Sequence, residues 1–592
     1  MAYRDMLRCG IAAALMVVGG SAQVMADQNY SGRTVEGLYT NVEKLEQGWS
    51  DASAQWYYHA TQGSQMMHYD IFMALETADS EKMLNSVLVE RYAYLPAVSK
   101  VGNPDMLPIG FARDEDGKNS WVGMTCAACH TGRIEYQGRA VLIDGAPALG
   151  DLSGLIAGMN DALKAARTDS AKQARFVERM LGKRPSKTAV AALIKRLDAN
   201  IARFNDIVLD SFLTAPGDQK VVWGHGRTDA FGMIFNRVAS TDLKYPGNRQ
   251  APNAPVSYPH IWDTGRFDWV QWNAVVPNDT VVEKLFRNAG EVLGVFGSAT
   301  LAKPTEKHNY YNSSVKVTYL LYMEDLVEKM TAPKWTEMFG ALDADKVKQG
   351  HDIYGKTCAA CHQLLPAGTG PFKVHLSKVA DVGTDPVMSK NALRMVNTAQ
   401  LGGSVMPPLL GSALASPNDL GVRLLANAVA GSVLGRFVDP FQEGVLFSLK
   451  ERALRVLAGF EYVEGGKISP AADRKKVELA LAAAVKLMGE KVTPDLSSYK
   501  ARPLDGIWAT APFLHNGSVA NLYQLLLPAA QRDKTFQVGS FKYDPKHAGY
   551  VTNEGGTTYD TTKAGNSNAG HEYGAALSDE DRWALVEYLK SL

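Results

Sequence analysis

Two short stretches combine cysteine and histidine at a spacing that can hold an iron porphyrin. Residues 126–130 and 358–362 both read C-A-A-C-H, and they contain four of the five cysteines of the 592-residue chain. Two cysteines three positions apart can form thioethers with the vinyl groups of one porphyrin, and the next imidazole can bind its iron. We therefore predict two covalently bound haem c groups. The residues that would bind them are Cys126, Cys129, His130, Cys358, Cys361 and His362.

Zinc binding and thiol redox chemistry are the alternatives. The paired cysteines of zinc ribbons lie within a few tens of residues of each other, whereas these two motifs lie in different halves of the chain. A redox dithiol would not require a histidine directly after its second cysteine, and it would not require one twice. Haem attachment is therefore the favoured interpretation.

The first 26 residues have the features of a secretory signal peptide. Arg4 and Arg8 precede a compact apolar stretch over residues 11–18, and Val24-Met25-Ala26 offers a cleavage signal. The fifth cysteine lies within this segment and would leave with it. Export to the periplasm, or secretion, agrees with the haem prediction, because bacteria attach haem c outside the cytoplasm.

The overall charge limits the kinds of partner. The chain has 62 basic and 62 acidic residues and no basic tract, which argues against nucleic acid as a partner. The apolar stretch of the signal is too short to cross a bilayer, and no other segment reaches that length. We predict no transmembrane span.

Helical patterning dominates the sequence. Residues 161–197 and 474–488 are rich in Ala, Lys, Arg and Leu and predict amphipathic surface helices. A short hairpin is expected near residues 133–143. The predicted fold class is mainly α with little β: two cytochrome c-like haem domains with large helical and loop insertions.

The clearest local architecture surrounds the second motif. Residues 343–354 predict a helix with Gly350 on one face, and Ser578 can cap another helix at the C-terminus. Such a pair crosses and encloses haem in small cytochromes c. We expect residues 343–592 to form a C-terminal cytochrome c-like domain and residues 27–333 an N-terminal haem c domain with insertions.

Several longer motifs resemble the di-haem cytochrome c peroxidase superfamily. They are W-G-H-G-R-T-D-A at residues 223–230, Q-W-N at 271–273 and A-T-A-P-F-L-H-N-G at 509–517. Stretches at 62–65, 262–264 and 565–571 resemble the large RoxA-like branch, which includes rubber oxygenases and fatty-acid dioxygenases. The resemblance implies that the first haem keeps an open face opposite His130 for a small oxidant. It also implies that the second iron has two protein ligands.

Three residues compete to be the further ligand of the second iron. His571 lies in a Gly/Asn-rich loop before the C-terminal helix, and His515 lies in the F-L-H-N-G turn. Met406 follows His362 at a spacing typical of methionine ligands in mono-haem cytochromes c. The resemblance favours His571, and the other two stay open.

Aromatic and amide residues suggest a reaction pocket. Trp262, Trp269 and Trp272 lie within eleven positions, and core packing is an equally good interpretation of such a cluster. Polar neighbours favour the pocket, and a predicted apolar helix over residues 281–296 would form its wall. The candidate catalytic residues are Trp262, Gln271, Trp272 and Asn273.

Arg227 and Asp229 have two interpretations. A guanidinium can hold a haem propionate through two hydrogen bonds, or this pair can brace the interface between the domains. The resemblance also admits a calcium ion between the haems, although no acidic loop with calcium-binding spacing is present in the sequence.

The function expected from these features is oxidation at a haem. The favoured hypothesis is an O2-dependent oxygenase of an unsaturated hydrophobic substrate, either a fatty acid or a polyisoprene-like alkene. The alternative is a peroxidase that reduces hydrogen peroxide with electrons from a small redox protein. That reaction needs an acid–base group at the open haem, for which His225 and His260 are candidates. An electron carrier would instead need protein ligands on both faces of both irons.

Overall fold

The structure is a computed structural model, and it describes residues 42–212, 223–303, 311–368, 370–404, 414–438 and 495–592. The predicted signal peptide, Met406 and the predicted helix over residues 474–488 lie outside these ranges.

The N-terminal part combines two three-stranded sheets with helices. Strand β1 pairs in parallel with β6, which pairs with β5, and the order of the other sheet is β2-β4-β3. The β5–β6 pair confirms the hairpin predicted near residues 133–143. The elements are β1 (Val42–Lys44), α2 (Asp51–His59), β2 (Met67–His68), α3 (Tyr69–Ala74), α4 (Leu88–Tyr92), β3 (Phe111–Glu115), β4 (Ser120–Met124), β5 (Thr131–Tyr136) and β6 (Arg139–Asp144).

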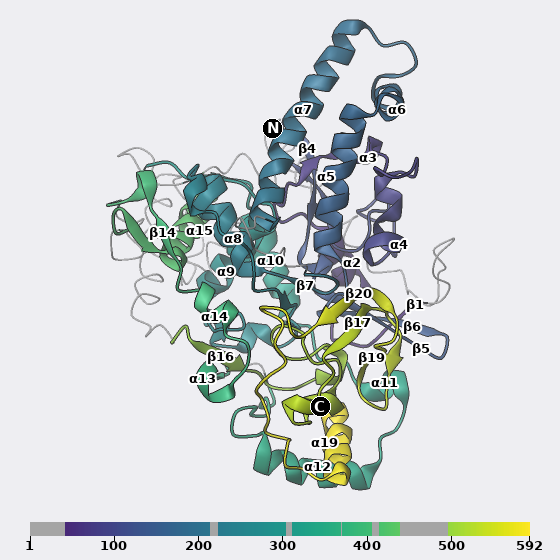
Figure 1. Cartoon of the computed structure of the whole chain (residues 1–592), viewed down its shortest axis with the longest axis vertical. Coiled ribbons are helices and arrows are strands. Elements are labelled where there is room, and N and C mark those ends of the chain that lie inside the picture. Colours follow the sequence, from purple (N-terminus) through teal and green to yellow (C-terminus); the bar gives the residue numbers. More distant parts are fainter. Residues whose placement is uncertain (1–41, 213–222, 304–310, 369, 405–413, 439–494) are drawn as a thin grey trace, which may run out of the picture.

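Three helices follow and project from one end of the molecule (Figure 1). They are α5 (Leu152–Thr168), α6 (Ser170–Leu181) and α7 (Lys187–Phe212). The single amphipathic stretch predicted over residues 161–197 is divided because Asp169 accepts hydrogen bonds from two backbone N–H groups and so begins a new helix. Gly182, with φ of 82°, then ends α6.

The central part is a group of apolar helices with short strand pairs. Helix α9 packs against α8, α10 and α15, and its buried residues share one hydrophobic cluster with those of α15. A capping box between Thr280 and Glu283 fixes where α9 begins. The elements are β7 (Arg227–Thr228), α8 (Ala230–Asn236), β8 (Val256–Ser257), β9 (Trp269–Val270), β10 (Val276–Pro277), α9 (Val281–Gly294), β11 (Ala299–Thr300), β12 (Asn312–Ser313), α10 (Val317–Val327) and α15 (Gly421–Val438).

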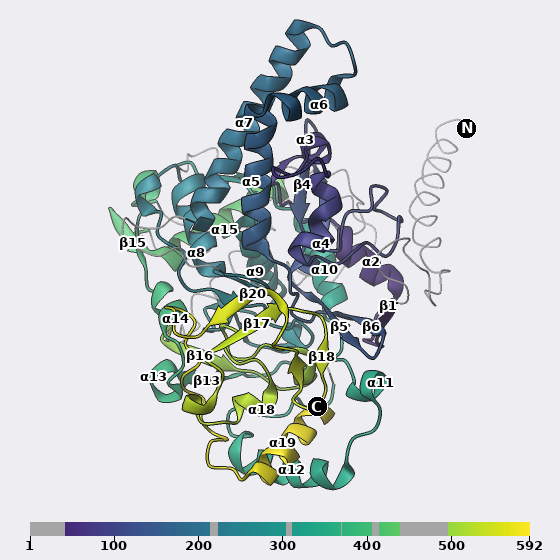
Figure 2. The ribbon, with the colours of Figure 1, turned by 45° about the vertical axis from the view of Figure 1, so that its right-hand side comes forward.

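The C-terminal part contains the predicted helix pair. Helices α12 and α19 lie side by side at the end opposite α7 (Figure 2), and Ser578 caps α19 through the N–H of Asp581. The elements are α11 (Trp335–Phe339), α12 (Ala344–Thr357), β13 (His375–Lys378), α13 (Val379–Val382), α14 (Val387–Asn391), β14 (Met395–Asn397), β15 (Asn418–Leu420), β16 (Ser498–Ala501), α18 (Leu522–Leu525), β17 (Thr535–Gly539), β18 (Tyr543–Asp544), β19 (Gly549–Tyr550), β20 (Gly555–Asp560) and α19 (Asp579–Ser591).

The prediction of a mainly α fold with little β is wrong. Among the described residues, 42% are helical and 16% lie in strands, so the fold is mixed. Most of these strands have two to six residues, and they pair as isolated ribbons such as β13–β16 and β17–β20. Such short pairs produce no sustained alternation of polar and apolar residues, which is why the sequence pattern did not reveal them.

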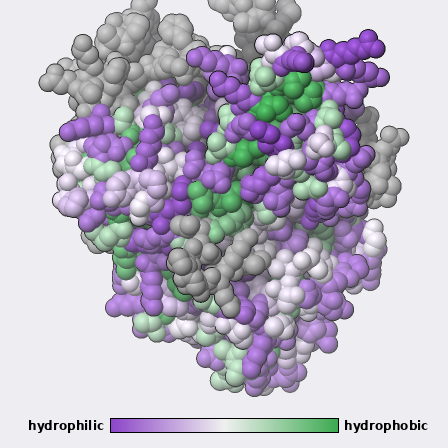
Figure 3. Space-filling model, turned by 45° about the horizontal axis from the view of Figure 1, so that its top comes forward, coloured by the Kyte–Doolittle hydropathy of each residue, from purple (hydrophilic) through white to green (hydrophobic). Residues whose placement is uncertain are grey.

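The face of the molecule drawn in Figure 3 is mainly hydrophilic. On the face drawn in Figure 3, hydrophobic residues gather in a few patches within polar surroundings. Within the described ranges, no helix is both long enough and apolar enough to cross a membrane.

Gly350 permits the close approach of α12 and α19. A Cβ at this position would lie 2.1 Å from the carbonyl oxygen of Ala584 and 2.6 Å from Cβ of Tyr588, whereas a Cβ at Gly355 in the same helix would meet nothing within 4 Å. We expect Gly350→Ala to lower the free energy of unfolding by about 3 kcal/mol. The control Gly355→Ala should raise it by up to about 1 kcal/mol through helix propensity. Chemical denaturation measures both, and equal effects of the two substitutions would contradict the close contact.

Candidate haem sites

His130 is held with one ring nitrogen available for a metal. Its Nδ1–H donates to the carbonyl oxygen of Pro259 at 2.8 Å, which fixes the tautomer because a carbonyl can only accept. Desolvation lowers the pKa of His130 to about 4, so the imidazole is neutral at pH 7. A neutral ring with Nδ1 engaged and Nε2 free is the form that binds metals in proteins.

His362 repeats this arrangement at the second motif. Its Nδ1–H donates to the carbonyl oxygen of Arg502 at 2.7 Å, and desolvation lowers the pKa of its imidazole. The hydroxyl of Tyr354 on α12 donates to the carbonyl oxygen of His362. The helix predicted before the motif therefore positions the backbone of the histidine directly.

His571 faces His362 at a distance that suits a shared metal ion. The ring centroids are 6.1 Å apart, with 63° between the ring planes. A metal bound to one nitrogen of each ring through bonds of about 2 Å would separate the centroids by roughly 6 Å. Desolvation lowers the pKa of His571 to about 3, and its Nδ1 is buried without a partner among the described residues. This pair fits the two axial positions of one haem iron.

A buried arginine organises the loop that presents His571. Arg532 donates to the carbonyl oxygens of Asn568, Gly570 and His571, at 2.6, 2.8 and 3.2 Å. The backbone of His571 has φ of 52°, in the left-handed region that non-glycine residues rarely occupy. Strained backbone of this kind concentrates at functional sites. The sequence analysis did not identify Arg532.

The other two candidates for this ligand have different environments. His515 is buried and packs against the ring of Tyr499, with centroids 4.3 Å apart. Met406 lies outside the described residues. The structure therefore brings His571, rather than His515, to His362.

The cysteines do not have the character of zinc or redox thiolates. Desolvation raises the pKa of Cys126 and Cys129 to about 12 and that of Cys358 to about 11. Thiols that bind zinc or exchange disulfides are instead held in surroundings that lower the pKa. Both motifs are therefore better suited to thioethers, which carry no charge.

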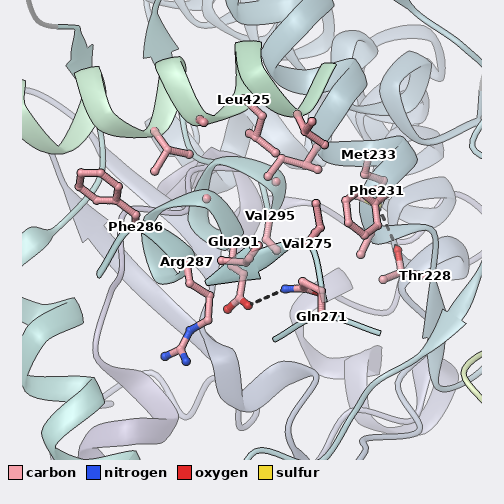
Figure 4. Close-up of a pocket in the computed structure, with 18 of the residues that line it drawn as sticks. Thr228, Phe231, Met233, Gln271, Val275, Phe286, Arg287, Glu291, Val295 and Leu425 are labelled. Carbon is pink, nitrogen blue, oxygen red and sulfur yellow. Dashed lines mark hydrogen bonds between the residues drawn. The ribbon is translucent and has the colours of Figure 1, made fainter. Parts of the chain in front are cut away.

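The first motif borders a cavity. This cavity, drawn in Figure 4, has a volume of about 230 Å³. Cys129 belongs to its lining. Most of the lining is apolar and comes from α8, α9, β10 and α15; among these residues are Phe231, Met233, Ile234, Val275, Val276, Phe286, Val295, Val422, Leu425 and Val429. A mostly apolar cavity with a few polar groups is typical of sites for small organic ligands.

Three polar side chains meet at one side of this cavity. The amide of Gln271 donates to the carboxylate of Glu291 at 3.2 Å, as Figure 4 shows, and Arg287 lies one turn before Glu291 on α9. Desolvation raises the pKa of Glu291. The sequence analysis missed Glu291 because the helix over residues 281–296 was interpreted as an apolar wall. The spacing of Arg287 and Glu291, four apart on that helix, was an available signal.

The predicted catalytic residues occupy different places. Gln271 lines the cavity, with φ of 67°. Trp262, Trp272 and Asn273 lie outside the cavity lining: Trp262 stacks on His260, and the indole of Trp272 donates to the carbonyl oxygen of Ser257. Both polar atoms of the Asn273 side chain are buried without a partner in the described part of the chain. Catalytic roles for these residues stay predictions.

Neither histidine considered as an acid–base group reaches the cavity. His225 is hydrogen-bonded to Thr557 at 2.8 Å, and His260 stacks on Trp262, with ring centroids 4.5 Å apart. Glu291, by contrast, lines the cavity.

Arg227 joins the two parts of the chain. Its guanidinium donates to the carbonyl oxygen of Trp223 at 2.8 Å and to the side-chain oxygen of Asn566 at 2.9 Å. Asp229 caps α8 through the N–H of Gly232. These contacts agree with the bracing interpretation, and a propionate contact of Arg227 stays a prediction.

Lys500 is a better match for a propionate. Its side chain is buried, and its ammonium group donates to the carbonyl oxygen of Trp269 at 3.4 Å. Desolvation lowers its pKa, so an anion would stabilise its charged form. For calcium, no group of three or more His, Cys, Asp or Glu side chains gathers within the described ranges. Calcium binding stays untested.

Comparison with known proteins identifies the class. Residues 498–537, from β16 into β17 and including Arg502 and Arg532, match the RoxA-like, cytochrome c-like family. This match implies a protein that binds haem c, akin to haem oxidoreductases. Membership of the wider di-haem peroxidase superfamily stays a prediction.

A relative of similar length gives the particular family. The uncharacterized protein y4iJ of Sinorhizobium fredii is 34% identical over 623 residues, which span 94% of each chain. The chain therefore belongs to the same protein family as y4iJ. A second uncharacterized protein of that organism, y4iM, is 36% identical over 125 residues, which cover 17% of this chain and 29% of the relative.

Removal of His571 tests the ligand pair. We expect His571→Ala to change one of the two haems from low spin to high spin, because a six-coordinate iron would lose one of its two imidazoles. Electron paramagnetic resonance of the ferric protein measures this change. His547→Ala, which alters a half-exposed histidine paired with Asp544, is the control. An unchanged spectrum for His571→Ala, together with a high-spin signal for His515→Ala, would assign the ligand to His515.

Proposed function

We propose that this protein is an exported di-haem c oxidoreductase, active in the periplasm or outside the cell, that uses O2 to oxygenate an unsaturated apolar substrate. The apolar cavity beside Cys129 carries the proposal. A bound haem supplies an iron that can activate a small oxidant. We propose neither a nucleic-acid partner nor a membrane-spanning segment for this protein.

The asymmetry between the two motifs supports different tasks for them. His362 has an imidazole facing it, which suits an iron with both axial positions filled. The first motif instead borders the cavity, so a haem attached to Cys129 would face its apolar lining. The second haem would then store or supply an electron, and the first would be the site of reaction.

The lining residues would select the substrate. Phe231, Val275 and Leu425 offer an alkene an apolar surface and exclude water from it. Incorporation of both atoms of O2 into the double bond needs no net electrons, so no continuous supply from a donor is required. We propose an unsaturated fatty acid as the first substrate class to test and a polyisoprene-like alkene as the second.

Oxygen uptake with a matched pair of substrates tests the oxygenase. We expect purified holoprotein to consume O2 with an unsaturated fatty acid or with polyisoprene latex, and to give a product heavier by two oxygen atoms or cleaved at the double bond. The saturated fatty acid of the same length should give no uptake, because it lacks the reacting bond. Oxygen-electrode traces and product mass spectra measure the two outcomes. Absence of uptake with every alkene would remove this function.

Glu291 favours peroxide reduction as a second candidate. A carboxylate of raised pKa can take a proton from one peroxide oxygen and return it to the other. The overall reaction consumes one H2O2, two protons and two electrons and yields two water molecules. A small redox protein would supply the electrons one at a time.

Substitution of Glu291 separates the two candidates. Under the oxygenase proposal, Glu291→Gln should retain oxygen uptake within about threefold, since the amide keeps the shape of the side chain and only general acid–base catalysis is lost. A peroxidase would lose a factor of about 10² to 10⁴.

The pH dependence gives an independent check. Wild-type peroxidase activity would fall as the pH drops through the raised pKa of Glu291, because the base must be deprotonated. That fall should be absent in Glu291→Gln. Steady-state assays with peroxide and a reduced donor cytochrome, over a pH series, measure both effects.

A further inference from the structure

We infer that Arg502 is a positioning residue that links the two haem sites and couples their electron exchange. This inference rests on the two-haem proposal above, because it concerns the two imidazoles that would bind the irons.

Arg502 contacts both sites through different groups. Its backbone carbonyl oxygen accepts the Nδ1–H of His362 at 2.7 Å. Its guanidinium donates from Nη2 to the carbonyl oxygen of His260 at 2.7 Å. The residue before His260 is Pro259, whose carbonyl oxygen accepts the Nδ1–H of His130 at 2.8 Å. The imidazoles of His130 and His362 are therefore joined by three hydrogen bonds, through the dipeptide Pro259-His260 and through Arg502.

The surroundings hold this bridge in place and exclude water from it. Arg502 is 6% exposed, and its guanidinium lies over the ring of Phe267, 5.5 Å from the centroid. On the other side, Trp262 is fully buried, stacks on His260 and donates from its indole to the carbonyl oxygen of Asp505 at 2.8 Å. Hydrogen bonds in such a low-dielectric environment are stronger than in water.

The same contacts explain why Trp262 lies away from the cavity. Its position fixes the backbone of His260, and with it the acceptor that Arg502 uses. Trp262, which was predicted to be catalytic, thus supports the contact between Arg502 and His260.

The bridge gives the second site a defined role in the proposed reaction. Two bound haems would supply one-electron chemistry, in which the second haem would be oxidised by one electron and the first reduced by the same electron. No covalent bond forms or breaks, and no proton has to move. The hydrogen bonds of Arg502 would give that electron a bonded route between the two imidazoles, and its positive guanidinium would affect the potentials of both haems.

Arg502→Gln isolates the guanidinium contact. The backbone carbonyl that holds His362 is present with any side chain, so the substitution removes only the guanidinium: its positive charge, its hydrogen bond to His260 and its contact with the ring of Phe267. The matched control is Arg266→Gln, which removes a nearby cation whose guanidinium donates to the carbonyl oxygens of Gly370 and Pro366 and not to that of His260. Haem content is measured first in every variant, by the haemochrome absorbance of the denatured protein.

The decisive readout is electron exchange between the haems after flash reduction by one electron, together with the reduction potentials of both haems. We expect Arg502→Gln to slow the exchange about tenfold, as one charge-assisted hydrogen bond is lost. Arg266→Gln should remain within about twofold of wild type, since it changes only a screened charge. Equal rates in Arg502→Gln and Arg266→Gln, with two haems present in each, would overturn the inference.

A conservative variant covers the case in which Arg502→Gln does not retain both haems. Arg502→Lys keeps the charge but replaces the planar fork with a single ammonium group. Its exchange rate should fall below that of Arg266→Gln, and a rate equal to that control would overturn the inference. Fewer than two haems in the wild-type protein would instead refute the two-haem proposal itself.

Discussion

The arrangement of both haem sites depends on one kind of hydrogen bond, which runs from Nδ1–H of a motif histidine to a backbone carbonyl and occurs once at each site. Pro259 supplies the acceptor for His130, and Arg502 supplies it for His362. Each bond fixes the tautomer and leaves the other ring nitrogen for iron. The helices and strand pairs around the motifs serve to bring these carbonyls to the imidazoles. In the second half of the chain, the β13–β16 pair ends directly before Arg502 and so determines where its carbonyl lies.

Different buried polar groups surround the two candidate haem sites. Desolvation lowers the pKa of His571, so its imidazole is neutral at pH 7. It lies opposite His362, in a loop that Arg532 stabilises by hydrogen bonds. Glu291 and Gln271 form the polar corner of an otherwise apolar cavity beside Cys129. One centre therefore has a facing imidazole and the other has space. Under the proposed function, this difference would distinguish an enzyme from a carrier of electrons.

Local sequence patterns predicted the parts of this structure that depend on neighbouring residues. The two C-x-x-C-H motifs, the capped helix α19 and the close approach at Gly350 were all available from spacing and residue type. The short strand pairs were not, because two to six residues carry little periodicity. Glu291 was hidden within a helix interpreted as apolar, and the contacts of Arg502 and Arg532 join residues far apart in sequence. Local sequence patterns do not predict contacts between residues so far apart in the sequence.

The separation between each histidine and its carbonyl has a consequence for the order of assembly. A porphyrin needs five consecutive residues for attachment, and a newly made chain presents them before it folds. The acceptors at Pro259 and Arg502 are synthesised much later, and they reach the imidazoles only when tertiary structure forms. With haem bound as proposed, attachment would come first, and folding would then orient each motif imidazole. Maturation of this protein would pass through a coloured but redox-untuned intermediate.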